Sequence, residues 1–530
     1  MSLQTQVIED DENKYLPEHP WIACLPIMLA IITYALDGTI ANVALPHMAG
    51  SFAATRDESM WILTSYIIAG GIVIPSVSFF SKLFGRKNFF TISILLFTIA
   101  SFLCGTAQNM AEMVFYRILQ GAGGGGLLPI AQALMMESFP KNERGKSIAV
   151  FGMGVIVAPI VGPVLGGWIT DNWTWPWIYF INVPIGCIAA VLSHKLLFNP
   201  PYARKQKNVK IDWWGFVFLI LWLSTLQVFF DKGNNADWFN ANWIRWLFSF
   251  SCLNGTLFFI SQILKLKKKD EPLVDLSVFK DRSYAVGTLI QIIMAAVLYA
   301  TVAILPQFLQ NMMGYTAYLS GLSMMPRGVG ALSGMIVCAF IADKVDKRFM
   351  VITGLLLMGS GAIYLGFLNL QISKISIMLP NMLMGFGTAL AMTPIINLSM
   401  ETLTNQQMTN ASGLQNLLKN IGGAIGTSLV GTMLTRFAQV HQNMLVGNLT
   451  PLNDNFFYRV KYIAGAFSQY ASPDMANQMA NYQLYRQLIQ QSTLMAFMDA
   501  LRIFGLMCII ITPLILFCKT KTHNIKHNKV

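Results

Sequence analysis

The amino-acid sequence predicts an all-α membrane protein. Three observations support this prediction: its composition, its long apolar segments and the placement of its basic residues. Of the 530 residues, 54% are hydrophobic and 12% are charged, whereas an ordinary soluble domain carries about 25% charged residues. A globule of this size could not cover its surface with so few charges, so lipid must be its solvent. The segments 61–80, 178–198 and 503–518 each come close to the ~20 apolar residues that cross a hydrocarbon core of ~30 Å.

Apolar segments separated by short polar turns predict fourteen membrane-spanning helices, and an even number of spans places both termini on one side. The predicted spans are 22–45, 60–80, 88–108, 112–136, 146–170, 178–198, 213–231, 242–264, 284–310, 317–342, 349–369, 376–400, 408–436 and 492–518. The chain then divides into a tail (1–21), a six-helix half (22–198), two inserted helices with basic flanks (199–283), a second six-helix half (284–518) and a second tail (519–530).

Basic residues lie in the loops on the side of the N-terminus, and the short opposite loops hold little more than Arg56. Cytoplasmic loops of membrane proteins carry such an excess of lysine and arginine. We therefore expect both termini in the cytoplasm. The net charge of +12 comes from these clusters, which argues against a nucleic-acid partner despite the attraction of basic proteins for phosphate.

The sequence contains no motif typical of a metal or cofactor site. We therefore predict neither an enzyme nor a bound cofactor. The seven cysteines lie in or beside apolar segments without metal-ligand spacing, and we interpret them as buried packing residues. The six histidines form no cluster. The glycine run 121–126 lacks the Lys-Ser/Thr of a phosphate-binding loop, and we interpret it as close helix packing in lipid. The acidic N-terminus lacks the features of a signal peptide.

Asp37 is the residue that most strongly suggests a function, because a carboxylate within a spanning helix costs at least ~2.5–3.5 kcal/mol and needs a partner. Arg117, in the fourth span, is expected at a similar depth, roughly 8–12 Å below the outer interface at 1.5 Å per residue. A carboxylate whose counter-charge approaches and leaves can bind and release a proton. The alternative is a static ion pair that fixes helix packing.

Two stretches of the chain repeat. The basic turn 81–87 after the second span matches 342–348 after the tenth, and 117–121 in the fourth span matches 381–385 in the twelfth. Spans 1–6 and 9–14 therefore form parallel repeats. Such repeats enclose a substrate site near the middle of the membrane in many transporters.

Other polar residues in or near spans leave alternatives open. Lys419 either lines a central cavity or extends to the interface. Asp499 and Arg502, three residues apart on one helix, are expected to pair. The outer segment 437–490 is either a solvated loop with some helix or a docking surface for a periplasmic partner.

Three motifs resemble those of a known family. They are Leu36 to Pro46 in the first span, Tyr116 to Gly121 in the fourth, and Gly154 with Gly162 to Gly167 in the fifth. Together they are similar to the fourteen-span drug:proton antiporters of the major facilitator superfamily, most of all to EmrB-type multidrug efflux pumps. The turn between the second and third spans has Lys82 where the superfamily usually has an aspartate, a departure that EmrB-like proteins share.

The resemblance implies a proton-coupled exporter of lipophilic drugs or toxic compounds in the bacterial inner membrane. It also implies partnership with an EmrA-like periplasmic adaptor and a TolC-like outer-membrane channel. Its implied sites are proton coupling at Asp37 and Arg117, a substrate cavity at Asn42, Gln120 and Lys419, an antiporter motif at Gly154, Gly162, Pro163, Gly166 and Gly167, and gating loops at Gly85, Arg86, Lys87, Asp343, Lys347 and Arg348.

Other functions stay open at this point. The same fold could carry a dedicated exporter of one natural compound, such as a siderophore or a fatty acid. A non-transporting receptor or scaffold is an alternative of another class. A nutrient importer is disfavoured by the fifth-span signature.

Overall fold

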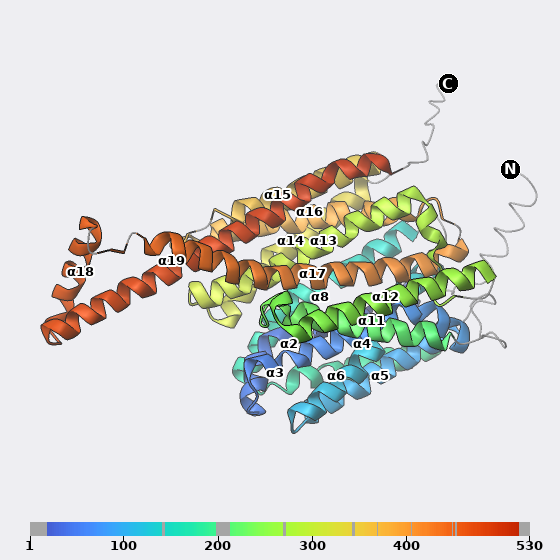
Figure 1. Ribbon diagram of the computed structural model, residues 1–530. Coiled ribbons are helices and arrows are strands. Elements are labelled where there is room, and N and C mark those ends of the chain that lie inside the picture. Colours follow the sequence, from blue (N-terminus) through green and yellow to red (C-terminus); the bar gives the residue numbers. More distant parts are fainter. Residues whose placement is uncertain are drawn as a thin grey trace, which may run out of the picture.

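The computed structural model describes residues 19–139, 144–197, 212–268, 272–341, 345–367, 369–403, 405–447, 449–450 and 453–518. Within these ranges the chain is helical, with turns between the helices (Figure 1), and the predicted all-α class is confirmed. The N-terminal half contains α2 (Pro20–Ser51), α3 (Arg56–Ser59), α4 (Trp61–Phe84), α5 (Arg86–Thr106), α6 (Met110–Gly125), α7 (Leu127–Glu137), α8 (Arg144–Asn172), α9 (Trp177–Phe180) and α10 (Asn182–Leu196).

The insert follows, and then the C-terminal half. The insert comprises α11 (Trp213–Gly233), η2 (Trp238–Asn240), α12 (Asn242–Lys268) and η3 (Leu276–Lys280). The C-terminal half contains α13 (Arg282–Gln307), η4 (Phe308–Met312), α14 (Ala317–Ile341), α15 (Lys347–Leu365), α16 (Lys374–Met400), α17 (Asn405–Val446), α18 (Asp454–Phe467), α19 (Pro473–Ile511) and η5 (Thr512–Phe517).

Ten helices within the described ranges are long and apolar enough to cross a membrane, and Trp61–Val77 is a shorter apolar helix. The chain is therefore a multi-pass membrane protein. The number of fourteen crossings stays a prediction.

The two halves pack their helices by the same plan, as the repeat in the sequence led us to expect. In the first half, α2 packs against α8 and α10, and α6 packs against α4 and α5. In the second half, α13 packs against α17 and α19, and α16 packs against α14 and α15. Each helix has a counterpart in the same chain order, which supports parallel repeats.

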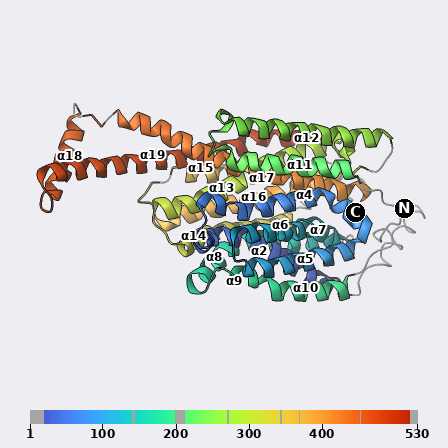
Figure 2. The same ribbon diagram turned by 60° about the horizontal axis from the view of Figure 1, so that its bottom comes forward.

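The halves meet along two seams, which are visible in Figures 1 and 2. At one seam α8 packs against α14, and at the other α4 packs against α17. The first seam is tight, since a Cβ at Gly321 would lie 3.2 Å from the Val164 side chain. The Ser412 hydroxyl of α17 also lies 3.3 Å from the Gln132 side-chain oxygen of α7. Because α14 is the counterpart of α4 and α17 is the counterpart of α8, the two seams are equivalent to one another when the halves are exchanged.

The predicted fourth span, 112–136, is divided into α6 and α7. Pro129 lacks the amide that would bond to the carbonyl four residues earlier, in the glycine run, and this interrupts the helix. The interpretation of that run as close packing is confirmed. A Cβ at Gly121 would lie 2.3 Å from the Tyr66 carbonyl oxygen, and one at Gly125 would lie 2.5 Å from that of Gly70. Only glycine lets α4 and α6 approach so closely.

Much of the segment 437–490, expected to be either a solvated loop with some helix or a docking surface, is helix. α17 has 42 residues and α19 has 39, which at 1.5 Å per residue is about 60 Å, twice the hydrocarbon thickness of ~30 Å. Their outer parts and α18 extend beyond the bundle as an arm (Figures 1 and 2). Ala476, Ala480, Leu484 and Leu488 form the buried stripe of α19 in this arm.

The cysteine prediction is correct for five residues and wrong for two. All seven cysteines are free; Cys187 and Cys252 are exposed, and the others are buried. In a membrane protein an apolar side chain can face lipid, so an apolar segment does not by itself imply burial. The described residues contain no cluster of histidine, cysteine and carboxylate side chains that could hold a metal ion.

Candidate functional site

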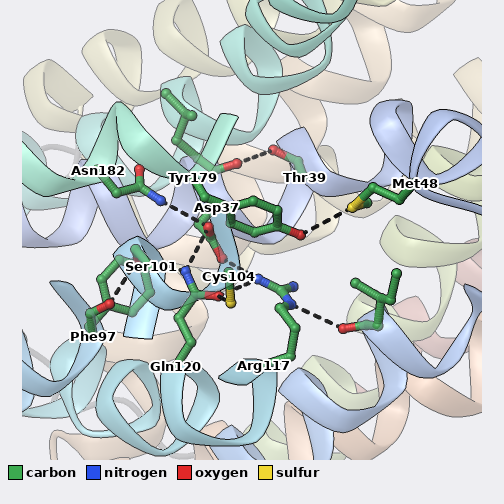
Figure 3. A network of polar contacts seen from close by, with 12 residues as sticks. Asp37, Thr39, Met48, Phe97, Ser101, Cys104, Arg117, Gln120, Tyr179 and Asn182 are labelled. Carbon is green, nitrogen blue, oxygen red and sulfur yellow. Dashed lines mark hydrogen bonds and ion pairs between the residues drawn. The ribbon is translucent and has the colours of Figure 1, made fainter. Parts of the chain in front are cut away.

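The structure brings Asp37 and Arg117 together at the centre of the N-terminal half (Figure 3). Arg117 Nη1 donates to Asp37 Oδ2 at 2.8 Å. Asp37 is 0% exposed and Arg117 is 1% exposed, so other parts of the protein surround the pair. The expected pairing of the two residues is therefore present in the structure, while their depth below the outer interface and their role in proton coupling stay predictions.

The other oxygen of Asp37 accepts hydrogen bonds from two amides. Asn182 Nδ2 in α10 and Gln120 Nε2 in α6 each donate to Oδ1 at 2.9 Å. Gln120 connects the network further, because its Oε1 accepts from Arg117 Nη1 at 2.6 Å and its Nε2 donates to Ser101 Oγ of α5 at 2.7 Å. Three donors therefore hold a carboxylate that has no contact with water.

Arg117 is fixed from its other side by α4 and α9. Its Nε donates to the Ile62 carbonyl oxygen at 3.0 Å. The guanidinium carbon lies 4.2 Å from the centre of the Tyr66 ring and 5.6 Å from that of Tyr179. A cation over an aromatic face is stabilised by ~2 kcal/mol or more when it is desolvated. Both charges thus lie in a preorganised environment.

This arrangement has a chemical consequence. Removing one partner of a buried ion pair costs ~3–5 kcal/mol, because the remaining charge is left uncompensated. A proton bound to Asp37 would cancel one charge of the pair and weaken its hold on Arg117 and on the two amides. The network can therefore exchange one proton for a change in helix packing.

The glycine-rich segment of α8, expected from the resemblance to be an antiporter motif, packs directly against the helix that carries Asp37. A Cβ at Gly162 would lie 2.2 Å from Thr39 Oγ1, and one at Gly166 would lie 2.7 Å from the Ile40 side chain. A Cβ at Gly154 would lie 2.6 Å from the flexible end of the Met28 side chain. Pro163 and Gly167 lie beside this face in α8 and are half-buried and buried, respectively. The spacing of these glycines lets α8 approach the turn that contains Asp37.

Of the three residues expected in a substrate cavity, one belongs to the network. That residue is Gln120. Asn42 is exposed on α2, five residues beyond Asp37. Lys419 is half-buried on α17, and no ion pair joins it to the described residues. A common cavity for the three stays a prediction.

The first expected gating turn links α4 to α5. Gly85 there has φ 84°, a conformation that favours glycine over other residues. Arg86 and Lys87 begin α5. The turn is therefore as sharp as the glycine predicts.

The second expected gating turn precedes α15. Lys347 Nζ pairs with Glu401 Oε2 at 3.1 Å, and Arg348 donates to the Cys518 carbonyl oxygen. Asp343 lies outside the described residues. The basic residues of this turn thus join the ends of α15, α16 and η5.

Sequence reasoning missed several polar residues that the structure places at functional positions. Asn182 could have been recognised from the sequence, because it is an amide within a largely apolar predicted span. Tyr66 and Tyr179 resemble ordinary lipid-facing aromatics, so only their contact with Arg117 reveals them. Asp231, at the last position of a predicted span, accepts hydrogen bonds from Thr64 and Gln227. His441 joins the predicted pair of Asp499 and Arg502.

The C-terminal half has a different buried charge. Arg327 of α14 is 6% exposed, and its Nη2 donates to Thr301 Oγ1 at 2.9 Å. Its Nη1 has no hydrogen-bond partner among the described residues, and neither has Asn381 Oδ1. Asn381 stands in α16 at the position that the repeat equates with Arg117. This half therefore lacks the ion pair of the first half.

Comparison with known proteins places this architecture in a family. The family model of the Major Facilitator Superfamily matches residues 27–427. The chain belongs to the major facilitator superfamily. Its first half, with the Asp37 network, and most of its second half lie within the matched residues.

Individual relatives show which members of the superfamily the chain resembles. The chain is 31% identical to the probable multidrug resistance protein EmrY of Escherichia coli K12, over 94% of this chain and 95% of EmrY. It is 33% identical to the multidrug export protein EmrB of Haemophilus influenzae, covering 81% and 83% of the two chains. It is also 33% identical to the fatty acid resistance protein FarB of Neisseria gonorrhoeae, covering 81% and 84%.

Solved structures show the same fold. One is a bacterial homologue of the human lysosomal transporter Spinster, in an inward-facing and occupied conformation, with a TM-score of 0.54 and 16% identity. The alignment covers 94% of this chain and 98% of that one. The resemblance to EmrB-type proteins expected from the motifs is confirmed, and the chain is a membrane transporter rather than an enzyme.

Proposed function

We propose that this transporter exports lipophilic drugs or toxic compounds across the bacterial inner membrane in exchange for protons. The observation that carries the proposal is the fully buried Asp37–Arg117 pair, held by Gln120 and Asn182. The related EmrB of Haemophilus influenzae is a multidrug export protein. Placing a carboxylate within a membrane span costs free energy, and proton coupling explains why the chain carries one there.

Asp37 binds the coupling proton, and Arg117 is its switch partner. Protonation removes the negative charge, so Arg117 Nη1 and the two amides lose an ionised acceptor. α2, which carries Asp37, is then less tightly held to α6 and α10, and the tight contact of α2 with the α8 glycines transmits the change to the seam with α14. One proton falling through ~100 mV yields ~2.3 kcal/mol, enough for a substrate gradient of about fifty-fold at ~1.4 kcal/mol per decade.

The expected substrates are flat lipophilic compounds, including hydrophobic uncouplers. The chain has 30 methionines and 35 phenylalanines, and adaptable methionine surfaces accept varied apolar ligands. Exclusive export of hydrophilic, multiply charged compounds would contradict this part of the proposal.

Topology and partners follow from the charge distribution and the arm. With both termini cytoplasmic, the arm of α17, α18 and α19 lies in the periplasm, where an EmrA-like adaptor could engage it and pass substrate to a TolC-like channel. Tyr462 and Tyr470 are 82% and 89% exposed on this arm, and tyrosine is a common anchor in protein interfaces. Deleting α18 should abolish adaptor capture while basal transport persists. Unchanged capture would remove the docking role.

The transport proposal is tested with purified protein in liposomes that carry an imposed pH gradient. A flat lipophilic fluorescent dye should move against its own concentration gradient only while protons flow down their gradient in the opposite direction. Collapse of the proton gradient with an ionophore should stop accumulation within the same trace. Accumulation that persists without any proton or ion gradient would contradict the proposal.

A second candidate is dedicated export of a fatty acid or a similar anionic natural compound. Two observations favour it. Arg327 and Lys419 are cations in the second half without an ion-pair partner among the described residues, and one relative is the fatty acid resistance protein FarB. Lys419→Gln should then weaken export of a fatty acid about tenfold and leave a neutral dye unchanged. Equal effects on both substrates would favour the multidrug function.

A further inference from the structure

The insert, residues 212–281, contacts both halves of the transporter, and its attachment to the two halves is unequal. We propose that it moves with the C-terminal half and that Asp231 forms a proton-sensitive latch between it and α4 of the N-terminal half. This inference rests on the rocking of the two halves in the proposed transport function.

The outer end of the insert is fastened to α17. Ser428 Oγ donates to the Phe230 carbonyl oxygen at 2.7 Å, and Trp238 Nε1 donates to Thr432 Oγ1 at 3.0 Å. Arg436 also pairs with Asp237. These directional contacts hold the end of α11 and η2 to one helix of the C-terminal half.

The inner end is fastened to the same helix. Asn410 of α17 donates to the Asp275 carbonyl oxygen at 2.8 Å, and its own side-chain oxygen accepts from the Asp275 amide at 3.2 Å. Within the insert, Asp212 pairs with Lys265 at 2.7 Å and accepts from Gln262 at 2.9 Å. The insert is thus an internally tied unit with α17 contacts at both ends.

The surface between the insert and α4 is mainly apolar. Phe216 of α11 meets Phe80 of α4 edge to face, with ring centres 6.3 Å apart. Ile74 of α4 packs in one cluster with Leu219 and Leu223 of α11. Apolar packing has no fixed hydrogen-bond geometry to break, so α4 can slide along α11 more readily than α17 can.

Asp231 makes a polar contact across this sliding surface within the described part of the chain. Its carboxylate accepts from the Thr64 hydroxyl of α4 and from Gln227 Nε2 of its own helix, the latter at 3.0 Å. Thr64 thereby connects the N-terminal half to the turn of α11 that Ser428 holds from the opposite half. Lys232 of α11 acts electrostatically on the Asp231 carboxylate, and Glu58 of α3 acts on Lys232. At the η2 turn that follows α11, Arg436 of α17 pairs with Asp237, and Arg245 of α12 donates to the Phe239 carbonyl oxygen.

The hydrogen bonds of the latch favour the ionised carboxylate, because both neutral donors stabilise negative charge. Rocking of α4 away from α11 removes the Thr64 hydroxyl and leaves the carboxylate with one donor beside apolar side chains. Asp231 then binds a proton from the outer side, and it releases that proton when Thr64 returns. Protonation therefore favours separation of α4 from the insert.

The test measures distances between spin labels in the full chain, in lipid nanodiscs, after replacement of the seven native cysteines. Labels replace Ala111 at the outer end of the N-terminal half, Trp246 in the insert and Gln439 in α17. Between pH 8 and pH 5.5, the 111–246 and 111–439 distances should change together, while the 246–439 distance stays fixed. A 246–439 distance that changes as much as the 111–246 distance would overturn the shared motion.

Two variants test the latch itself. Asp231→Asn mimics the protonated carboxyl and Thr64→Val removes the donor, so each should raise the separated population at pH 8 at least threefold. Asp171→Asn, at an exposed position, and Thr225→Val, whose hydroxyl bonds within α11, should leave the population unchanged. Unaltered distances at pH 8 in both latch variants would overturn the proposal. Because these distances are measured without substrate, they separate failure of the latch from failure of proton-driven export.

Discussion

The two halves of this transporter share a packing plan and differ in their buried charges. In the first half, Asp37 accepts hydrogen bonds from Arg117, Gln120 and Asn182. In the second half, α13, which corresponds to α2, has no acidic residue between Arg282 and Gln307. Close helix packing is therefore common to both repeats, whereas a carboxylate that can carry a proton lies in the first.

Glycine contacts make the comparison more exact. A Cβ at Gly121 would lie 2.3 Å from the Tyr66 carbonyl oxygen, and one at Gly385 would lie 1.8 Å from that of Arg327. The position of Tyr66, whose ring covers Arg117, is thus held by Arg327 in the second half. Duplication of a fold can preserve the backbone contacts while one copy loses the ion pair and places a lone cation nearby. The difference places a buried ion pair in the first half and, among the described residues, a buried arginine without a carboxylate partner in the second.

The largest expected effect is a difference in the free energy of unfolding between variants of the two buried arginines. Arg117→Met leaves the Asp37 carboxylate buried without its cation, and it should lower the free energy of unfolding by ~3–5 kcal/mol. Arg327→Met removes a cation that has no carboxylate partner and one hydrogen bond, so it should change stability by about 1 kcal/mol or less. Thermal unfolding of both variants in the same detergent measures the difference. Equal destabilisation would show that the halves do not differ as described.

Two glycine substitutions, one in each half, test the same comparison with a smaller expected change in stability. A Cβ at Gly162 would meet Thr39 Oγ1 at 2.2 Å, and one at Gly426 would meet the Ala296 carbonyl oxygen at 2.1 Å. Gly162→Ala and Gly426→Ala should each destabilise the fold by ~1–3 kcal/mol through overpacking.

Proton coupling should respond to only one of these two glycine variants. The turn beside Gly162 carries Asp37, so Gly162→Ala should lower the number of protons moved per substrate. Gly426→Ala should slow both fluxes equally. Simultaneous recording of proton and dye fluxes in liposomes measures the ratio, and a ratio unchanged in both variants would contradict a link between the α8 motif and Asp37.

The smallest expected effect concerns an acid that serves structure alone. Burial by itself would raise the pKa of Asp212, but the side chains of Lys265 and Gln262 and the Gly215 amide outweigh burial and lower that pKa. A carboxylate with a lowered folded-state pKa stabilises the fold above its unfolded pKa, and this contribution is lost as the pH falls through the folded pKa. Asp212→Asn should therefore lose a modest stability at neutral pH and little at acidic pH, while export stays coupled to protons. Loss of coupling in this variant would remove the contrast with Asp37.

Much of the architecture could be predicted from the sequence, because lipid allows few alternatives for an apolar segment. The expected depth of Asp37 and Arg117 followed from the fixed rise of the helix, and the structure places them in contact. The contact of Asn182 with Asp37 and that of Ser101 with Gln120 could not be predicted, since the partners are 145 and 19 positions apart and their rotational positions depend on packing. Asp231 was missed because a carboxylate at the end of a span resembles an ordinary interfacial residue.

The outer arm shows where hydropathy stops being informative. The segment 437–490 is rich in Gln, Asn and Tyr, a composition that favours a solvated loop as much as a helix. The structure forms helices there because the buried stripe of α19, which includes Leu484 and Leu488, is covered. Such pairing is a property of two segments and cannot be inferred from either one alone.

Asp37→Asn tests the central claim most directly. The amide keeps the size of the side chain and its hydrogen-bonding capacity, and it is cheaper to bury than a carboxylate, so the protein should still fold and insert. With an imposed proton gradient, liposomes containing this variant should show no uphill dye export and no substrate-induced proton flux, although exchange of dye at equal concentrations persists. The matched control Asp171→Asn, at an exposed position, should behave like the unmodified protein. Uphill export by Asp37→Asn would show that the proton travels elsewhere and that Asp37 serves only as half of a structural ion pair.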